Sequence, residues 1–364
     1  MSDPLIAAAA AAIGLDAFDD VSEILHGDRS RVLRVRAGDA SYIVKGYLTD
    51  EGDTRARETA ALRALDGLDV VSDLVGTSAD PPLIVVRDLG EHPNVADAVL
   101  GRDPGVADRA VDAWTDAIAD MHATTDEGVL DSFATHLASM APHRATHGVP
   151  GALEWSVGKY DELAAAIDLP VPAGFADELL ALPDRFRRNE VVLTAGDCCP
   201  DNNALMGDRA VLYDFEFAEI RHVAWDVAYL RVPWPTCWCA WRLPDAVAAR
   251  GVARYRERLA PRIPYVATDD FLHDLDVATV GWCLMSASWW IPPALDEDTF
   301  QGGDEDAPST RPKMLHRLWL AGQLPADPEL TSYARALHRA LVRRWGDPAL
   351  VLAPAWRDDD IAIP

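Results

Sequence analysis

The sequence has few cysteines for its length, and its basic residues are far outnumbered by its acidic ones. Of its 364 residues, five are Cys, 33 are Lys or Arg and 59 are Asp or Glu, so the formal net charge is 33 − 59 = −26. Such an excess disfavours a nucleic-acid backbone, which needs Lys and Arg to replace its counterions, and equally an anionic membrane surface. We therefore expect no nucleic-acid or membrane partner. A neutral or cationic partner is favoured, or an anion that arrives with a metal ion.

The five cysteines do not have the spacing of a disulfide framework or of a zinc site. Two are adjacent, two form a CxC and one stands alone: Cys198, Cys199, Cys237, Cys239 and Cys283. None belongs to a pair of CxxC motifs, the usual spacing of structural zinc ligands. We interpret them as reduced thiols of a cytoplasmic protein, with metal binding as the less favoured alternative.

Long hydrophobic runs are also missing. The apolar run that begins with Ala7–Ala12 is preceded by Asp3 and soon followed by Asp16. A signal peptide would have a basic start and a longer apolar core, and a membrane span needs about 20 apolar residues. The run predicts an Ala-rich first helix instead. The chain also lacks G-x-x-x-x-G-K-[ST] and H-E-x-x-H, which excludes P-loop enzymes and one large class of zinc proteases.

The first hundred residues have the pattern of a sheet with one central helix. Short strands are predicted by β-branched runs between turn residues at Val21–Leu25, Arg31–Ala37, Ser41–Tyr47, Val70–Val75 and Leu83–Arg87. The helix is predicted at Thr54–Leu65. This segment, residues 1–90, would form a small β-rich lobe that a hinge at about residues 86–94 joins to the rest.

Residues 95–364 are predicted to form a larger, mostly helical lobe, with 49% hydrophobic residues overall to fill its core. Helical periodicity is found at Val106–Ala123, Asp161–Ile167, Phe175–Phe186, Pro244–Leu259, Asp269–Trp290 and Pro328–Arg344. A β-rich segment, Val191–Ala195 with Ala204–Asp214, interrupts the helices. The acidic stretch Asp296–Lys313, which contains Gly and Pro, is predicted to be a mobile loop.

Two strands of that β-rich segment end in acids, with an amide between them. Asp197 follows the first strand, Asn202 comes five positions later on a Pro-containing loop, and Asp214 follows the second strand. The twelve positions between Asn202 and Asp214 are a spacing that a tight hairpin can close. An amide oxygen and a carboxylate that converge in this way form a hard, oxygen-rich site suited to Mg²⁺. Asp197 would face a substrate hydroxyl and accept its proton.

The run AGDCCPDNNAL…VLYDFEFA…HVAWDVA resembles the aminoglycoside phosphotransferase and choline kinase-like family, the small-molecule branch of the protein-kinase-like fold. That family's usual form is HGDxxPxN, then I-D-W/F-E/D, then W-D-L/V-A. The resemblance continues upstream, in the expected order, at Tyr42–Lys45 for the strand lysine, Arg57–Leu62 for the helix glutamate and Leu83–Gly90 for the strand that leads to the adenine-binding hinge.

The resemblance implies an α+β, two-lobe, protein-kinase-like fold, ATP and Mg²⁺ as cofactors, and a role for each matching residue. Lys45 would bind the α- and β-phosphates while Glu58 orients its ammonium, and Val86, Asp88 and Leu89 would lie at the nucleotide hinge. Asp197 would be the catalytic base, and Asn202 and Asp214 the metal ligands, with Asn203 as a rival to Asn202. Asp226 would brace the catalytic loop without touching the substrate.

The sequence departs from the family pattern at two places. Ala195 stands where the family has the His before Gly-Asp, which should loosen the loop without abolishing chemistry. The first hairpin, His26–Arg31, has one glycine and lacks G-x-G-x-x-G, so the backbone cover of the phosphates is weakened, although Ser30 could contribute a hydroxyl.

The acceptor is predicted from the tryptophans and acids of the helical lobe. Trp289 and neighbouring Trp residues occur in the same part of the chain as Glu216, Glu219 and Asp274, a combination that suits a cationic hydroxyl compound. The alternative is that most of the tryptophans fill the core, and Glu216 could serve the metal instead. We expect an O-phosphotransferase for an aminoglycoside-like or other cationic hydroxylated small molecule. A choline-, ethanolamine- or sugar-specific kinase, or a silent nucleotide-binding homologue, remains open, as does a monomer or homodimer.

Overall fold

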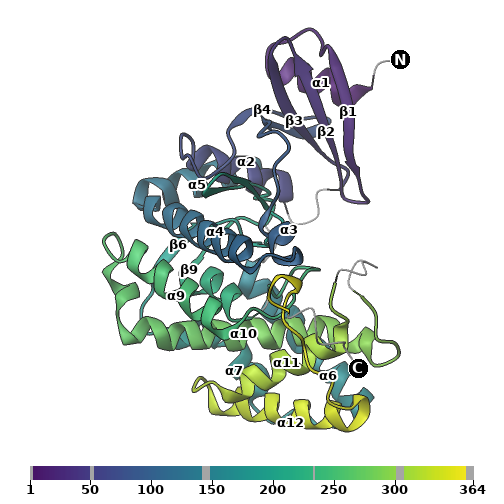
Figure 1. Cartoon of the computed structure of the whole chain (residues 1–364), viewed down its shortest axis with the longest axis vertical. Coiled ribbons are helices and arrows are strands. Elements are labelled where there is room, and N and C mark those ends of the chain that lie inside the picture. Colours follow the sequence, from purple (N-terminus) through teal and green to yellow (C-terminus); the bar gives the residue numbers. More distant parts are fainter. Residues whose placement is uncertain (1–2, 50–52, 142–147, 233, 301–306, 358–364) are drawn as a thin grey trace.

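The N-terminal part of the chain is a five-stranded antiparallel sheet. The structure, a computed structural model, describes residues 3–49, 53–141, 148–232, 234–300 and 307–357. The strands are β1 (Asp20–His26), β2 (Ser30–Ala37), β3 (Ala40–Tyr47), β4 (Leu74–Ala79) and β5 (Pro82–Arg87). Their spatial order is β1-β2-β3-β5-β4. Figure 1 shows this sheet as a separate layer at one end of the molecule, with helix α1 (Pro4–Ala12) against it.

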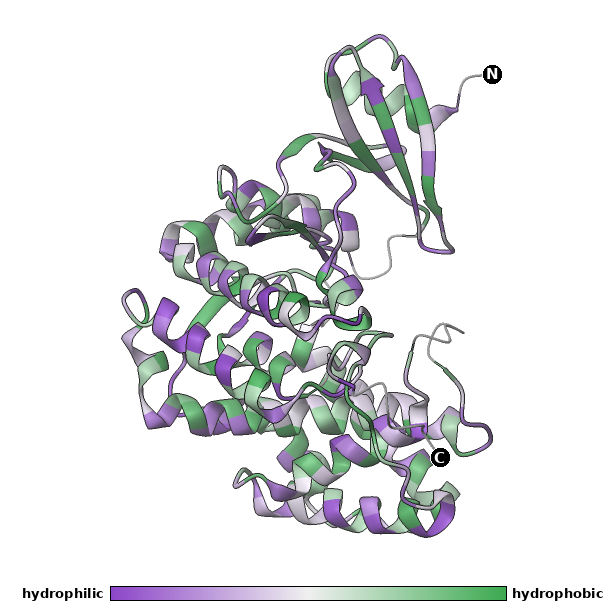
Figure 2. Cartoon of the chain, in the orientation of Figure 1, coloured by the Kyte–Doolittle hydropathy of each residue, from purple (hydrophilic) through white to green (hydrophobic). Residues whose placement is uncertain are grey.

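The two faces of the sheet have different tasks because side chains alternate along each strand. Leu33, Val44 and Val85 are fully buried on the face that α1 covers. The residues next to them along each strand, Val32, Lys45 and Ile84, are paired with one another across the sheet and line a cleft on the other face. Figure 2 shows hydrophobic and hydrophilic residues following one another along these strands. The alternation therefore brings Lys45 to a cleft whose sheet side also carries Arg34 and Ser30 among apolar side chains.

Helix α2 (Thr54–Ala64) belongs to the N-terminal segment of the sequence but packs mainly on the other part of the molecule. It contacts α5 (Glu127–Met140), and its Ala56, Ala60 and Ala61 are members of the large hydrophobic core. The chain leaves the sheet at Arg87 and enters helix α3 at Val95. The seven residues between them connect the two parts.

The rest of the chain is mostly helical. The α-helices are α3 (Val95–Leu100), α4 (Pro104–Thr124), α5, α6 (Gly148–Ile167), α7 (Phe175–Leu180), α8 (Ala224–Val227), α9 (Asp245–Leu259), α10 (Asp269–Ala294), α11 (Thr310–Gln323) and α12 (Pro328–Trp345). The short 3₁₀ helices are Leu182–Arg185, Ala228–Leu230, Pro264–Ala267 and Pro354–Trp356. Several starts are fixed by an Asp cap followed by Pro, as at Asp103-Pro104 and Asp327-Pro328, where the carboxylate accepts from free N–H groups of the first turn. Helix α10 is buried on nearly all sides and packs against α6, α8 and α11, so it is the centre of this bundle.

Two short antiparallel strand pairs lie between the sheet and the bundle. Strands β6 (Val191–Thr194) and β9 (Glu219–His222) pair antiparallel, and so do β7 (Asn203–Met206) and β8 (Arg209–Leu212). Leu212 is also tied to the N-terminal part, because its N–H donates to Val70 and its carbonyl accepts from Ser72. The β7–β8 hairpin is thus hydrogen-bonded to the N-terminal part of the molecule.

The predicted α+β, two-lobe, kinase-like fold is confirmed, and most predicted elements are present. The fourth strand was placed too early: Val70–Val75 contains a single bridge from Val71 to Leu212, and the strand itself starts at Leu74. Helices α3, α5, α8 and α11 and strand β9 were not predicted, and α6 was predicted only over its last part, Asp161–Ile167. The predicted loop Asp296–Lys313 was too long, since α11 begins at Thr310, and its central residues 301–306 lie outside the described part of the chain.

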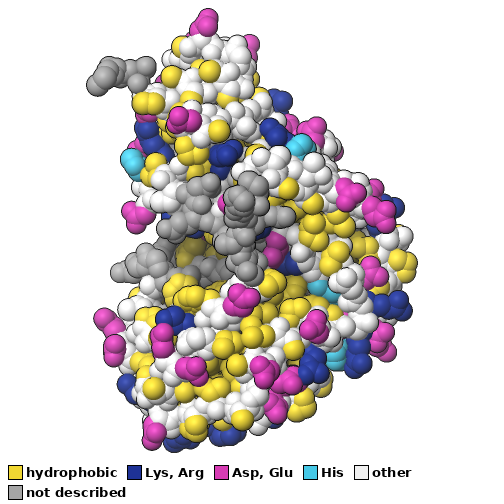
Figure 3. Space-filling view, turned by 180° about the vertical axis from the view of Figure 1, so that it is seen from behind, with side chains coloured by type: hydrophobic (Ala, Val, Ile, Leu, Met, Phe, Trp, Pro, Cys, Tyr) yellow, Lys and Arg dark blue, Asp and Glu magenta, His cyan; other side chains and the backbone are white. Residues whose placement is uncertain are grey.

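The surface reflects the composition. In the face shown by Figure 3, acidic side chains are spread over both parts of the molecule and alternate with Lys and Arg, without one dominant basic patch. Among the described residues, no helix is both long and apolar enough to cross a bilayer.

Candidate active site

A first cavity, of about 360 Å³, lies under the N-terminal sheet. Its lining includes every residue predicted to bind the nucleotide, namely Ser30, Lys45, Glu58, Val86, Asp88 and Leu89. Apolar side chains of Ile24, Val32, Ile43 and Ile84 form much of the rest. The side chain of Asp88 is already engaged, since it accepts hydrogen bonds from Arg34 and Ser41 at 2.8 and 2.6 Å. Asp88 therefore ties the start of the connection between the two parts of the molecule to the sheet, and its backbone N–H adds a hydrogen bond to the Ser41 carbonyl at 3.2 Å.

Lys45 is the charged centre of this cavity. Its ammonium lies 2.9 Å from Glu58, 3.0 Å from Glu216 and in direct contact with Asp214. Burial alone would lower the pKa of Lys45, but the three carboxylates raise it above its ordinary value, so the side chain is charged at neutral pH. Glu58 is held in turn by Tyr47, whose hydroxyl donates to it at 2.5 Å. The strand lysine and the helix glutamate predicted as a pair do form one.

The predicted catalytic base, Asp197, lies near the start of the loop that follows β6. Gly196 turns the chain with φ +79°, and a Cβ at that position would lie 1.9 Å from the carbonyl oxygen of Phe217. Only glycine fits there. The turn aims Asp197 at a cavity, where Thr236 donates a hydrogen bond to its Oδ1 at 2.7 Å. Burial raises the pKa of Asp197 above its usual range, with hydrogen bonds from Cys199 and Thr236 opposing the rise. A carboxylate of raised basicity is suited to accept a proton from a hydroxyl.

The hairpin β7–β8 brings Asn202 and Asp214 to the same cavity, as their spacing predicted. Tyr213 N–H donates to the carbonyl of Asn202 at 3.1 Å and closes the hairpin end. The amide nitrogen of Asn202 donates to the backbone carbonyl of Asp197 at 3.1 Å, so its oxygen is the atom free to meet a ligand. Asn203, the rival, is fully buried and binds Val95 N–H and the Pro200 carbonyl, which makes it structural.

These oxygen atoms form a donor set that fits a magnesium ion. Asn202 and Asp214 line a common cavity of about 310 Å³ together with Asp197. The carboxylates of Glu58, Asp214 and Glu216 converge to within 4.8 Å of one another. Hard oxygen ligands of this kind match the preference of Mg²⁺. Asp214 is held at φ +65°, a conformation that non-glycine residues rarely adopt and that keeps its carboxylate turned toward Lys45.

Glu216, predicted as a substrate contact or metal aid, lies on the nucleotide side. Besides Lys45, it pairs with Arg29 at 3.2 Å. Arg29 is at the tip of the β1–β2 hairpin, and its guanidinium also lies 5.7 Å from the ring centre of Phe217. The hairpin that lacks the glycine-rich motif therefore reaches across to the catalytic segment through an arginine.

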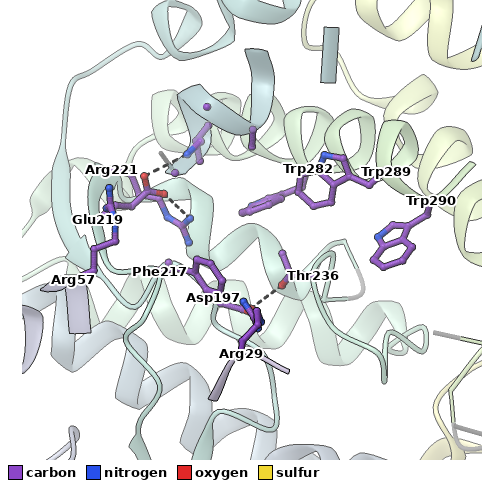
Figure 4. A pocket seen from close by; sticks show the side chains of 15 residues that line it. Arg29, Arg57, Asp197, Phe217, Glu219, Arg221, Thr236, Trp282, Trp289 and Trp290 are labelled. Carbon is purple, nitrogen blue, oxygen red and sulfur yellow. Dashed lines mark hydrogen bonds and ion pairs between the residues drawn. The ribbon is translucent and has the colours of Figure 1, made fainter. Parts of the chain in front are cut away.

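A second pocket, of about 610 Å³, opens on the other side of Asp197. Figure 4 shows Trp282, Trp289 and Trp290 on one side and Glu219, Arg57 and Arg221 on the opposite side, with Asp197, Arg29 and Phe217 between them. Asp197 lines this pocket as well as the cavity that holds Asn202 and Asp214. The carboxylate is thus placed at the junction where a bound acceptor would meet a nucleotide.

A buried ion-pair network supports the floor of this pocket. Glu219 accepts from Arg221 at 3.0 Å, and Arg221 also binds Asp226, which lies 2.9 Å from His122 Nε2. Burial alone would raise the pKa of Asp226, but the Arg221 guanidinium and His122 hold it well below its usual range. Asp226 lies beneath the catalytic loop, where the Cys198 thiol hydrogen-bonds to it. Asp226 was predicted to brace this loop without touching the substrate; it contacts Cys198 of the loop and does not line the pocket.

Asp274 is not brought to the pocket. It is fully buried in α10 and is bonded by the Arg187 N–H at 2.8 Å and by the Tyr265 hydroxyl. Of the predicted acceptor residues, the structure brings Glu219 and Trp289 into the second pocket and Glu216 to the 310 Å³ cavity that Asn202 and Asp214 line, whereas Asp274 lines neither. The tryptophans divide in the same way, because Trp114, Trp225 and Trp234 are core residues while Trp282, Trp289 and Trp290 line the pocket.

Comparison with known proteins agrees with this geometry. The model of the phosphotransferase enzyme family matches residues 20–262 of the chain. A search of curated proteins found no match. Solved structures share the fold. An ethanolamine kinase from Plasmodium vivax superposes with TM-score 0.53 at 13% identity, covering 89% of this chain and 82% of the kinase. A choline/ethanolamine kinase family protein from Mesorhizobium loti gives 0.52 at 15%, with 91% and 97% covered. A proposed aminoglycoside phosphotransferase from Ralstonia eutropha gives 0.55 at 14%, with 92% and 98% covered.

The two lobes, and the lysine, glutamate and paired acids between them, define a kinase-like small-molecule phosphotransferase. The chain belongs to the phosphotransferase enzyme family, whose model covers two thirds of its length.

Several residues that shape the site were not found by sequence reasoning. Thr236, which bonds Asp197, and Arg29, Arg57 and Arg221, which line the second pocket, lie outside the motif. Arg221 had one signal: it stands two positions from Glu219, so an extended strand places both on one face. Thr236 had none, because its contact spans 39 positions.

Proposed function

We propose that the protein transfers the γ-phosphoryl group of ATP, with Mg²⁺, to a hydroxyl of a small molecule held in the tryptophan-walled pocket. The observation that carries this proposal is the position of Asp197, which lines both the acceptor pocket and the cavity that contains Asn202 and Asp214. In-line phosphoryl transfer needs the attacking hydroxyl and the leaving oxygen on opposite sides of the γ-phosphorus, so the group that accepts the hydroxyl proton has to lie where the acceptor pocket meets the phosphates.

Each residue of the site then has one task. Lys45, fixed by Glu58, binds phosphate oxygens of the nucleotide, and the apolar floor of the cleft holds the base. Asn202 and Asp214 would hold Mg²⁺, which when bound neutralises charge on the phosphates. Asp197, oriented by Thr236, accepts the proton of the attacking hydroxyl. Because the transition state of such reactions is loose, positioning and charge neutralisation account for most of the rate.

A divalent ion would explain how a strongly acidic chain could bind a polyanionic nucleotide. Lys45 contacts three carboxylates, Glu58, Asp214 and Glu216, so the cavity is negative before a nucleotide arrives. A nucleotide that arrives with Mg²⁺ would release Lys45 from Asp214, since both the ion and the phosphates compete for these partners. Binding should therefore depend strongly on the divalent ion.

The acceptor is proposed from the charges of the second pocket. The described lining offers the carboxylates Asp197 and Glu219, and Glu219 is already paired with Arg221. A polyamine such as an aminoglycoside needs several unpaired acids. The indole faces suit a single cationic group or a flat apolar body. We therefore place a hydroxyl compound with at most one positive charge, choline-like compounds included, ahead of a polycationic aminoglycoside, the acceptor expected first from the sequence.

A coupled assay of nucleotide consumption tests this proposal. Purified protein with Mg-ATP would be offered choline and ethanolamine, neutral sugars and nucleosides, macrolide-type monocations and aminoglycosides, with product mass used to confirm a gain of one phosphoryl group. We expect turnover with a neutral or singly charged acceptor, and none in the Asp197→Asn variant. Binding of Mg-ATP without phosphorylation of any compound would favour the silent homologue, and turnover confined to aminoglycosides would contradict the assignment of the pocket.

A further inference from the structure

Three cysteines and an aspartate gather beside the catalytic loop, although they are distant in the sequence. Cys199 and Asp201 belong to the loop between Asp197 and Asn202, while Cys237 and Cys239 follow the 3₁₀ helix Ala228–Leu230. The Sγ atoms of Cys199 and Cys237 and a carboxylate oxygen of Asp201 all lie within 4.8 Å of one another. Cys239 Sγ lies a further 3.2 Å from Cys237 Sγ.

This cluster has the composition of a site for a borderline or soft metal ion and differs from the magnesium donor set. Thiolate sulfur together with a carboxylate oxygen suits Zn²⁺, which is usually bound by four ligands in a tetrahedron. Two sulfur atoms at Zn–S bonds of about 2.3 Å then lie about 3.8 Å apart, within the 4.8 Å that the cluster spans. Magnesium disfavours sulfur, so the two sites, although adjacent, would not compete for one ion.

The surroundings of Asp201 also match a metal-binding carboxylate. One oxygen of Asp201 accepts from the indole N–H of Trp238 at 2.8 Å, and the other faces the Cys237 thiol at 3.5 Å. Its backbone carbonyl accepts from the Tyr213 hydroxyl at 2.8 Å. Metal-ligating carboxylates are oriented by outer hydrogen bonds of this kind. A disulfide would need no carboxylate aimed at the thiols.

The cluster is buried but reachable. Cys199 and Cys237 are 5% and 2% exposed, yet both, with Asp201, line the 310 Å³ cavity that contains Asn202. An ion can therefore enter from that cavity, and a fourth ligand position would face it.

From this geometry we infer a second metal site, for Zn²⁺, held by the Sγ atoms of Cys199 and Cys237 and a carboxylate oxygen of Asp201. The two thiols bind as thiolates, so each ion that enters releases two protons. The site joins the catalytic loop to residues 234–241, the segment that carries Thr236 to its hydrogen bond with Asp197. Its role is to position Asp197, and it takes no part in the chemical step.

Zinc titration of the full chain tests the site directly. Protein purified under reducing conditions and stripped with a zinc-selective chelator would be titrated with ZnCl₂ against a chromophoric competitor, with Mg²⁺ in large excess. We expect one zinc per chain, bound more tightly than about 1 µM, a higher melting temperature with zinc, and a thiolate-to-metal absorption band when Co²⁺ replaces it.

The variants Cys199→Ser, Cys237→Ser and Asp201→Asn should each bind zinc at least about tenfold more weakly, since each removes or weakens one ligand. Cys283→Ser is the matched control, because Cys283 is a buried free thiol of α10 outside the cluster. It should keep the full zinc stoichiometry. Zinc removal should lower kcat more than it raises the KM for ATP, since Thr236 acts on Asp197 and not on the nucleotide cavity.

Wild-type protein that binds no zinc at these concentrations, and whose melting temperature is the same with and without zinc, would overturn the inference. So would a disulfide within the cluster, detected as three alkylated cysteines in place of five after unfolding. Loss of zinc in Cys283→Ser as well would show that binding is not at this cluster.

Discussion

At the scale of single residues, the charged groups of the site differ in their ion-pair and hydrogen-bond partners. Lys45 contacts three carboxylates, Glu219 is paired with Arg221, and Asp226 is bonded by both Arg221 and His122. The main partners of Asp197 are a hydroxyl and a thiol, which are uncharged and lower its pKa less than burial raises it. This difference in partners supports the proposal that Asp197 is the proton acceptor.

Replacing Asp197 by Asn should therefore remove catalysis and leave binding intact. We expect kcat to fall by about 10²–10⁴-fold, the usual contribution of a general base, with little change in the affinity for Mg-ATP. Steady-state kinetics and nucleotide titration of the variant measure the two effects separately. Asp208→Asn is the control, because Asp208 is exposed in the turn between β7 and β8; its kcat should equal that of the wild type. A full rate in the Asp197 variant would remove Asp197 from the mechanism.

The residue assignments also show what a motif can predict. Lys45, Glu58, Asp197, Asn202 and Asp214 converge as predicted, since their order and spacing in the chain repeat a pattern that one geometry explains. Asp274 was grouped with the acceptor residues because it is an acid near tryptophans in sequence. Helix α10 turns it instead toward Tyr265 and the Arg187 N–H. Which face of a fully buried helix carries a polar residue cannot be read from periodicity.

At the scale of elements, the catalytic loop is shaped by the β6–β9 strand pair before it and the β7–β8 hairpin after it. At Gly196 the backbone that leaves β6 passes very close to the carbonyl of Phe217, which lies just before β9. The β7–β8 hairpin then sets the separation of Asn202 and Asp214. A small change in either strand pair should therefore displace Asp197, Asn202 and Asp214.

Gly196→Ala should be costly for two separate reasons, and Gly207→Ala distinguishes them. Both glycines have positive φ, +79° and +72°, but a Cβ at Gly207 would meet nothing within 4 Å. The control should lose about 1 kcal/mol of unfolding free energy from backbone strain alone. The Gly196 variant should lose clearly more, and its kcat should fall as well, because the 1.9 Å approach to Phe217 forces the loop to move. Urea unfolding and kinetics of both variants measure this; equal losses of stability would contradict the account.

Strand β9 carries a histidine that should give the fold a dependence on pH. His222 is stacked on Phe186, with ring centres 4.0 Å apart, and faces Asp274 at 3.6 Å. Burial lowers its pKa to about 4, with Asp274 opposing the change. The unfolded chain therefore takes up the proton first, near pH 6.5, and the folded chain follows only near pH 4. Stability is unaffected above about pH 6.5 and falls between these two values.

The His222→Phe variant should lack this part of the pH dependence. From the difference in pKa, the wild type should lose about 3 kcal/mol more between pH 6.5 and pH 4 than the variant. Urea unfolding at several pH values measures the two slopes, and the variant's lower stability at neutral pH does not affect the comparison. Identical slopes would show that His222 is protonated as readily in the folded as in the unfolded chain.

At the scale of the whole molecule, the helix α2 precedes the connection between the lobes in the sequence but packs with the helices that follow it. The predicted division at residues 86–94 coincides with the connection from β5 to α3, but α2 packs on α5 and joins the large core. The alternation along β2, β3 and β5 predicted the sheet, because it follows from local sterics and burial. The packing of α2 could not be predicted, since it depends on α5, a helix 63 positions later that the sequence did not reveal.

The same reasoning explains the zinc cluster. Cys199 and Cys237 are 38 positions apart, and neither belongs to a motif with metal-ligand spacing, so the sequence favoured ordinary thiols. The fold brings them together because Thr236 and Trp238, on either side of Cys237, bond Asp197 and Asp201 on the loop. Long-range contacts of this kind are a property of the whole structure.

The central claim is that Lys45 and Asp214 bind a nucleotide together with a divalent ion between the two lobes. The most direct measurement is calorimetric titration of a non-hydrolysable ATP analogue, with and without Mg²⁺, into the wild type and the Asp214→Asn and Asp197→Asn variants. The account predicts binding that Mg²⁺ strengthens at least about tenfold in the wild type and in Asp197→Asn, a strengthening lost in Asp214→Asn. Affinity that is the same with and without Mg²⁺, or unchanged in Asp214→Asn, would contradict it.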